Sequence, residues 1–237
     1  MSYRVLALLA LVPAAAFAQT QGDVPENKPA ARGLGVSGSA QLLSDYRFRG
    51  VTRSGYDPAV QGQLTLSLQN GLYAGGRATS LHRQNPLGDA EIDLYAGYGT
   101  EIASGTRLDA GVQYYAFAGG AGRGHYAEPY ASLTHTLGPV QATVGAKYAW
   151  AQSGTGDRGQ LYMFGQAEAD IPLTPVTLTA EAGRQSGGAL PDYWNWSLGG
   201  RYRLFGPVEA GLRYVDTDLP AGRGGRAGVV ASLGLRF

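Results

Sequence analysis

The sequence predicts an all-β protein, a closed antiparallel transmembrane β-barrel of about twelve strands. Three observations predict it: polar and apolar residues alternate with a period of two, charged residues keep to one side of that alternation, and aromatic residues on the other side gather near strand ends. The 237 residues include 37 glycines and no cysteine. This composition suits short strands with many turns and excludes cysteine-based metal sites and disulfide frameworks.

The first 18 residues have the features of a cleaved signal peptide. Arg4 gives a positive start, an apolar run follows, and Ala16-Phe17-Ala18 fits a small-residue cleavage site. The apolar run is too short to cross a hydrocarbon core of about 30 Å as a helix. Residues 19–35 show no periodicity, which predicts a flexible N-terminal lead, with a plug inside the barrel as the alternative. The barrel itself is expected over residues 36–237.

The clearest alternation runs through residues 59–69, where even positions are apolar or glycine and nearly all odd positions are polar. Such a strand must meet an apolar environment on one face and a polar one on the other. Asn70-Gly71 follows directly and is the strongest two-residue hairpin signal. Twelve windows of this kind are expected as strands: 36–49, 59–69, 72–81, 90–100, 106–117, 125–136, 140–151, 161–169, 176–186, 193–204, 207–215 and 226–237.

The charged residues distinguish a membrane barrel from a soluble sandwich. The windows contain 19 Asp, Glu, Lys or Arg residues, and 18 of them, all but Arg184, lie on the polar face. A Lys or Arg facing lipid at the bilayer midplane costs about 2–4 kcal/mol, which would produce this sorting. A soluble sandwich would fill its apolar face with larger core residues, whereas this face is rich in small aliphatic ones. Closure is required because an open sheet would leave unpaired edges in hydrocarbon.

Aromatic residues on the apolar face are expected to form two girdles at the membrane–water interfaces. The connections alternate between short and longer, as periplasmic turns and outer loops do, and twelve strands place both termini in the periplasm. The predicted outer girdle is Tyr46, Phe48, Tyr114, Tyr148, Trp150, Trp194, Trp196 and Tyr214, and the predicted inner girdle is Tyr98, Tyr202 and Phe237.

The polar face is expected to line the lumen. Arginines concentrate on the last three strands and the first, and carboxylates on the strands between them. These two walls could form a transverse field that filters small solutes, or ion pairs that brace and close the barrel. The predicted pore-lining residues are Asp45, Arg47, Arg49, Arg77, Glu91, Asp93, Glu128, Lys147, Glu181, Arg201, Arg213 and Arg226.

No motif predicts catalysis, a metal or a cofactor. Gly154 to Gly159 matches a dinucleotide-binding pattern, but strand periodicity follows it and no helix is available to hold a pyrophosphate. His82, His125 and His135 lack metal-ligand spacing. A net charge of +1 gives no basic field for nucleic acid.

Several stretches resemble the TorF porin family. The most specific is Leu43-Ser44-Asp45-Tyr46-Arg47-Phe48-Arg49-Gly50-Val51, and 57–62, 71–75, 193–199 and 211–218 look similar. The resemblance implies an outer-membrane β-barrel that acts as a channel. The last strand with its terminal Phe237 resembles the signature by which the barrel insertion machinery recognises its clients.

The expected function is passive passage of small polar or ionic solutes through the outer membrane, in contact with lipid and lipopolysaccharide. Two alternatives stay open. One is an enzyme acting on envelope lipid, for which His125 with a nearby serine is the only start. The other is a closed structural or adhesive barrel.

Overall fold

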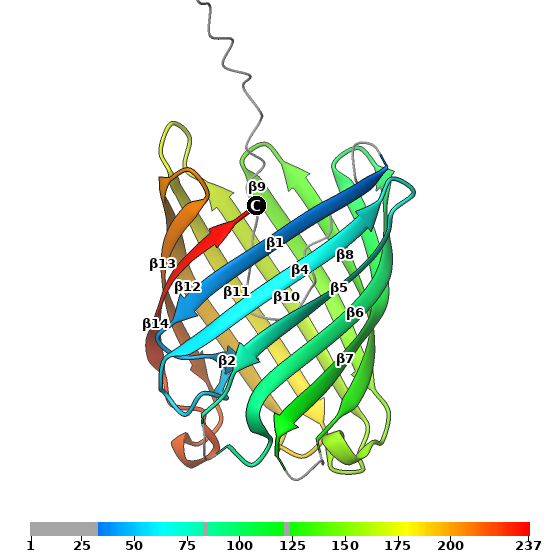
Figure 1. The fold of residues 1–237 in the computed structure, drawn as a ribbon, viewed down its shortest axis with the longest axis vertical. Helices are drawn as coiled ribbons and strands as arrows, with labels where there is room; N and C mark the ends of the chain where they lie inside the picture. Colours follow the sequence, from blue (N-terminus) through cyan, green and yellow to red (C-terminus); the bar gives the residue numbers. More distant parts are fainter. Residues whose placement is uncertain (1–32, 83–84, 121–123) are drawn as a thin grey trace, which may run out of the picture.

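The computed structural model describes residues 33–82, 85–120 and 124–237, which form a closed antiparallel barrel of twelve strands (Figure 1). Each barrel strand pairs with its neighbours in sequence, and β14 closes on β1 through the register Ser39↔Arg236 to Leu43↔Ser232. The predicted fold class is confirmed. The barrel strands are β1 (Leu34–Leu43), β4 (Ala59–Leu68), β5 (Leu72–Ser80), β6 (Gly88–Ala103), β7 (Thr106–Gly119), β8 (Tyr126–Leu137), β9 (Val140–Ala149), β10 (Gln160–Asp170), β11 (Val176–Gly187), β12 (Tyr193–Phe205), β13 (Val208–Thr217) and β14 (Gly228–Arg236).

The period-two pattern sets these strands, and all but the first agree with the predicted windows to within about three residues at each end. The expected signal peptide (1–18) and most of the expected lead (19–35) lie outside the described residues. β1 begins at Leu34, two residues before the expected start of the barrel. The helical segments are two short 3-10 turns, Ser153–Thr155 and Ala221–Arg223, and no helix of the described residues is long and apolar enough to cross a membrane.

The two ends of the barrel differ in the length of their connections. The start of β1, the C-terminus and the short turns lie together at one end, here called the turn end (Figure 1). At Asn70-Gly71 the Asn70 side chain accepts a hydrogen bond from the Leu72 N–H at 3.1 Å, and Gly71 has a φ of 94° that favours glycine. The longer connections, including 44–58, 150–159 and 218–227, lie at the opposite end, here called the loop end.

The exterior is apolar and the interior polar, as the alternation predicts. On β4, Leu64 and Leu66 are 48% and 42% exposed, whereas Thr65 between them is 2% exposed. Glu91 and Asp93 on β6 are fully buried inside the barrel. A continuous outer band of exposed leucine and valine side chains matches the surface that hydrocarbon requires.

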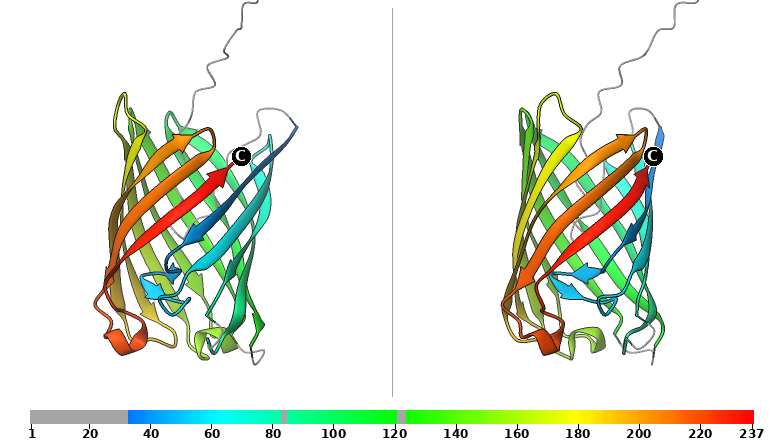
Figure 2. Two further views of the ribbon diagram at one scale, coloured as in Figure 1. Left: turned by 60° about the vertical axis from the view of Figure 1, so that its left-hand side comes forward. Right: turned by 90° about the vertical axis from the view of Figure 1, so that its left-hand side faces the viewer.

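Figure 2 shows that the chain after β1 does not continue along the wall but turns into the barrel near the loop end. This segment, residues 44–58, contains a small hairpin made of β2 (Arg47–Phe48) and β3 (Val51–Thr52). Its side chains Tyr46 and Phe48 share one buried cluster with Leu43, Leu81 and Tyr115. The interior is therefore a packed core at the loop end.

The predicted first strand, 36–49, is wrong beyond Leu43. Tyr46 and Phe48 are 0% and 7% exposed inside the barrel, so their assignment to the outer girdle is also wrong. The residues from Asp45 to Arg49 alternate as a strand should. Alternation is a local property, however, and does not reveal whether a strand joins the wall or folds inward.

The other residues predicted for the girdles are all exposed. Six lie toward the loop end, namely Tyr114, Tyr148, Trp150, Trp194, Trp196 and Tyr214. Three lie toward the turn end, namely Tyr98, Tyr202 and Phe237.

Placing a charge on the exterior tests this orientation. Leu94→Arg, in the middle of β6, should reduce the free energy of unfolding in lipid vesicles by about 2–4 kcal/mol, because the guanidinium would face hydrocarbon. Leu137→Arg, at the turn end of β8, is the control and should cost about 0–1 kcal/mol. Urea titration in vesicles measures both. Equal costs would contradict a membrane-facing exterior.

Candidate functional site

The candidate site is the lumen together with the segment 44–58, here called the inward loop. β2 and β3 pair through Arg47↔Thr52 and Phe48↔Val51, and Arg49-Gly50 forms the turn between them. Both turn residues have positive φ angles, 51° and 81°, as a type I′ hairpin requires. Gly50 adopts this conformation freely, whereas Arg49 is strained by it and must be held by its contacts.

Asp45 organises the inward loop from within. Its carboxylate accepts hydrogen bonds from Arg47 Nε at 2.6 Å, Thr52 Oγ1 at 2.6 Å and Ser54 Oγ at 3.0 Å. The Ser54 oxygen in turn accepts the Tyr46 backbone N–H at 2.8 Å. These bonds fold the loop on itself, so it is presented to the lumen as a preformed unit.

Arg49 carries the tip of the hairpin across the lumen. Its guanidinium binds Glu128 on β8 in a bidentate pair, with Nη2–Oε2 at 2.6 Å and Nη1–Oε1 at 3.2 Å. Nη1 also donates to Gln185 Oε1 on β11 at 2.8 Å, and the guanidinium lies 4.2 Å from the ring centre of Tyr162 on β10. The Arg49 and Glu128 side chains are 1% and 0% exposed. One side chain therefore ties the loop to three wall strands.

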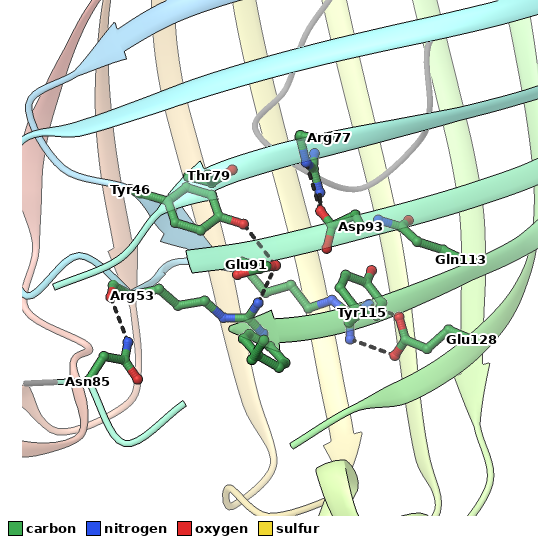
Figure 3. Close-up of polar contacts among 12 residues, drawn as sticks. Tyr46, Arg53, Arg77, Thr79, Asn85, Glu91, Asp93, Gln113, Tyr115 and Glu128 are labelled. Carbon is green, nitrogen blue, oxygen red and sulfur yellow. Dashed lines mark hydrogen bonds and ion pairs between the residues drawn. The ribbon is translucent and has the colours of Figure 1, made fainter. Parts of the chain in front are cut away.

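A second anchor joins the loop to β6 (Figure 3). Arg53 Nη1 lies 2.5 Å from Glu91 Oε1, and the Tyr46 hydroxyl donates to the same oxygen at 3.1 Å. Burial raises the pKa of Tyr46 well above its ordinary value, and the Glu91 carboxylate raises it further, so the phenol stays a neutral donor. Burial by itself would lower the pKa of Arg53, but Glu91 holds it above its ordinary value. Arg53 therefore stays cationic beside the Glu91 side chain.

The inward loop is also fixed at its flanks. Arg47 Nη1 donates to the backbone carbonyl of Arg226 at 2.6 Å, which joins the loop to the 218–227 connection. Asn85 Nδ2 donates to the Arg53 carbonyl at 2.7 Å, as Figure 3 also shows. The loop is held by polar contacts on every side of the lumen that it reaches.

Further charges lie on the wall beneath the inward loop. Arg77 on β5 pairs with Asp93, its register partner on β6. Lys147 on β9 is fully buried and donates to Gln113 Oε1 on β7 at 2.9 Å. All four side chains are at most 8% exposed, so this part of the lumenal face is packed.

Arginines dominate the turn end of the lumen. Four arginines lie on β12–β14, and we call them the arginine wall: Arg201, Arg203, Arg213 and Arg236. All but Arg213 lie within 4.0 Å of Glu209. Arg201 also pairs with Glu168 on β10 at 2.9 Å, and Arg236 lies 3.5 Å from Glu209. The wall borders a recess of about 70 Å³ that Ser39 and Gln41 complete.

A second recess, of about 140 Å³, opens at the loop end and is here called the mouth recess. It lies over the hairpin of the inward loop, with Arg49 and Gln185 among its lining residues. Between the two recesses the side chains of Glu91, Gln113 and Lys147 are at most 2% exposed. The inward loop and these buried side chains therefore occupy part of the lumen between β6 and β9.

The structure brings most of the predicted pore-lining residues into the interior, though not all on strands. Asp45, Arg47 and Arg49 belong to the inward loop rather than to the first strand. Arg226 lies in the 218–227 connection with an exposed side chain, so its prediction as a strand residue lining the pore is wrong. The remaining eight lie on lumenal faces of the wall, namely Arg77, Glu91, Asp93, Glu128, Lys147, Glu181, Arg201 and Arg213.

Two residues that hold the inward loop, Arg53 and Gln185, are not among the predicted pore-lining residues. Arg53 lies in what reads as an irregular connection, where no periodicity marks a residue as inward-facing. Gln185 has lumenal parity on β11, but it carries no charge to attract attention. The alternation along β11 could have identified Gln185 as a residue facing the lumen. The position of Arg53 depends on how the loop folds, which the sequence pattern does not show.

His125 makes a hydrogen bond to the backbone. Its Nδ1 accepts the Phe117 backbone N–H at 3.1 Å, and its ring stacks near Tyr114 and Phe117. That nitrogen is therefore not available to activate a serine. Over the described ranges, no three His, Asp or Glu side chains group as metal ligands would.

Comparisons with known proteins agree on the architecture. The family described as "Bacterial protein of unknown function (Gcw_chp)" matches residues 27–230. A KdgM porin structure has a TM-score of 0.60 at 9% identity, covering 85% of this chain and 98% of that chain. A NanC porin structure has a TM-score of 0.57 at 12% identity, covering 86% of this chain and 99% of that chain. The COG4313 outer membrane channel from Pseudomonas putida F1 has a TM-score of 0.56 at 13% identity, covering 91% of this chain and 99% of that chain. A comparison with curated proteins gives no match.

A double-mutant cycle tests the anchor at the hairpin tip. Arg49→Ala or Glu128→Ala alone should reduce the free energy of unfolding by about 3–5 kcal/mol, because each leaves a buried charge unpaired. The double variant should lose less than the sum, with a coupling energy of about 1–3 kcal/mol by urea titration in vesicles.

The control cycle uses Arg184 and Asp192, whose side chains are 37% and 52% exposed and 3.6 Å apart. Their coupling should be about 0–1 kcal/mol. Coupling between Arg49 and Glu128 no larger than that of the control pair would show that the buried pair does not hold the loop.

Proposed function

We propose that this chain, which belongs to the Gcw_chp family, is an outer-membrane channel for small polar and ionic solutes, gated by the inward loop. The single observation that carries the proposal is the position of that loop. It reaches across the lumen beside the mouth recess and is held there by contacts with Glu91, Glu128 and Gln185 and with the backbone carbonyls of Arg226 and Gly224. The likeness to three porins and channels supports the fold, and the TorF resemblance favours the same class.

The contacts of the loop suit a gate better than a permanent plug. The lost hydration of a buried ion pair offsets much of the attraction between its two charges. Such a pair therefore stabilises the folded protein less than apolar packing of the same volume would. Glu91 Oε2 and Asp93 Oδ1 are also buried without a hydrogen-bond partner among the described residues. Each such atom costs about 1–3 kcal/mol, which hydration in an open state would recover. Water can therefore replace these contacts when the loop moves.

The membrane placement follows from the exterior and the connections. The apolar band contacts lipid, the exposed aromatic residues lie at its two borders, and the loop end faces outward with lipopolysaccharide. Both termini then lie in the periplasm, after removal of residues 1–18 as a signal peptide. The last strand, ending at Phe237, is the segment through which the barrel insertion machinery would act.

A permanently closed structural barrel is the second candidate. The complete burial of Glu91, Gln113 and Lys147 in the middle of the lumen favours it. The two candidates differ in whether release of the loop opens a path, and conductance decides between them.

Loosening the loop tests the gate. Arg49→Ala combined with Arg53→Ala should raise the open probability in planar bilayers several-fold, because both anchors of the hairpin are lost. Arg158→Ala with Arg223→Ala is the matched control, since both are exposed loop arginines at the same end. The control should behave as the wild type does. Circular dichroism checks that the barrel is folded.

A cysteine pair gives a second readout that does not depend on loss of the anchors. The chain has no cysteine, and a Cβ on Gly50 would lie 2.8 Å from Asn195 Cβ, so a small movement of the loop suits Gly50→Cys and Asn195→Cys to a disulfide. Oxidation should hold the loosened variant shut, and a reductant should open it again. A conductance that changes neither on oxidation nor on reduction would favour the closed structural barrel.

The arginine wall predicts a preference for anions in the open state. In the loosened variant, Arg213→Gln with Arg236→Gln should shift the reversal potential in a KCl gradient toward cations, because two lumenal positive charges are removed. Arg158→Gln with Arg223→Gln, both exposed and outside the lumen, should leave it unchanged. An unchanged potential in the first variant would remove the wall from the conduction path.

A further inference from the structure

The mouth recess contains a buried donor with nothing to bind. Gln185 is 4% exposed, and its Oε1 accepts Arg49 Nη1 at 2.8 Å. A guanidinium can only donate, so the atom facing Arg49 must be the carbonyl oxygen, and this fixes the orientation of the amide. Nε2 is then the other atom, and it has no hydrogen-bond partner among the described residues. Buried donors are normally satisfied, so this one calls for an oxygen acceptor.

Aromatic rings form much of the rest of the recess. Phe48 comes from the inward loop, Phe117 and Tyr126 from β7 and β8, and Tyr193 from β12. All four are at most 7% exposed, so their positions are fixed by packing. Rigid rings around one polar donor suit a solute that has both apolar C–H surface and hydroxyl groups.

The charges near the recess are already compensated. Arg49 is neutralised by Glu128, and Arg53 by Glu91. Gln160 also donates to Glu128, at 2.9 Å. A carboxylate solute would find no uncompensated positive partner on these two arginines, whereas a neutral solute can use the amide without upsetting either pair.

We propose that the mouth recess binds the hydroxylated ring of a neutral saccharide, with Gln185 Nε2 donating to a ring hydroxyl oxygen. The recess is about 140 Å³, against about 30 Å³ for each water molecule in the liquid, so a small ring would displace several waters. The inference deepens the proposed function, since it names a solute class at the mouth of the channel. The binding itself does not require conduction, so the two can fail separately.

Binding of glucose to the refolded full chain in detergent tests the proposal, by saturation-transfer NMR with glucuronate as the charged analogue. Gln185→Glu keeps an acceptor for Arg49, removes the donor and adds a negative charge, and it should weaken glucose binding about tenfold. Gln185→Leu should weaken it by at least as much. Gln141→Glu and Gln141→Leu, made at the turn end, are the matched controls and should bind as the wild type does.

A wild-type measurement covers the case in which the variants fail to fold. In glutamine-labelled protein, glucose should shift the side-chain amide resonance assigned to Gln185 and leave that of Gln141 unmoved. The proposal is overturned if glucose does not bind, if the Gln141 variants lose as much as the Gln185 variants, or if glucuronate binds more tightly than glucose.

Discussion

Every barrel strand of this protein separates an apolar surround from an enclosed polar space, and the rest of the structure depends on that constraint. Because the barrel is closed, its backbone groups pair within the wall and no edge is left to cover. Because the exterior must be apolar, nearly all charged strand residues are directed inward. They are then too crowded to remain individually hydrated, so they must satisfy one another.

The inward loop completes this pairing. Glu91 and Glu128 lie on the wall, and their cationic partners Arg53 and Arg49 come from the loop. The same pairs that neutralise the wall therefore also hold the loop inside the lumen. The ionic and hydrogen-bonding contacts of the loop, which add to the packing of Tyr46 and Phe48 in the core at the loop end, can be exchanged for water. This is the physical basis for treating the loop as a gate.

The two ends of the lumen have different chemistry. At the loop end the arginines are matched by carboxylates, and aromatic rings surround the amide of Gln185. At the turn end the arginine wall exceeds its carboxylates. A solute entering from the loop end would first be selected by shape and hydrogen bonding and then meet a positive field. In the proposed channel, selection at the mouth and ion preference at the turn end are thus separable properties.

The sequence by itself determined the barrel class, eleven of the twelve strands closely, and the inward direction of Glu91, Asp93, Glu128 and Lys147, because side-chain direction along a strand follows a strict period of two. Only the tertiary structure decided that the chain leaves the wall after Leu43, burying Tyr46 and Phe48, and that Arg53 reaches Glu91. Alternation reports the two faces of an extended segment, whereas the sheet that it joins is set by contacts between residues distant in sequence, here Arg49 with Glu128 and Gln185.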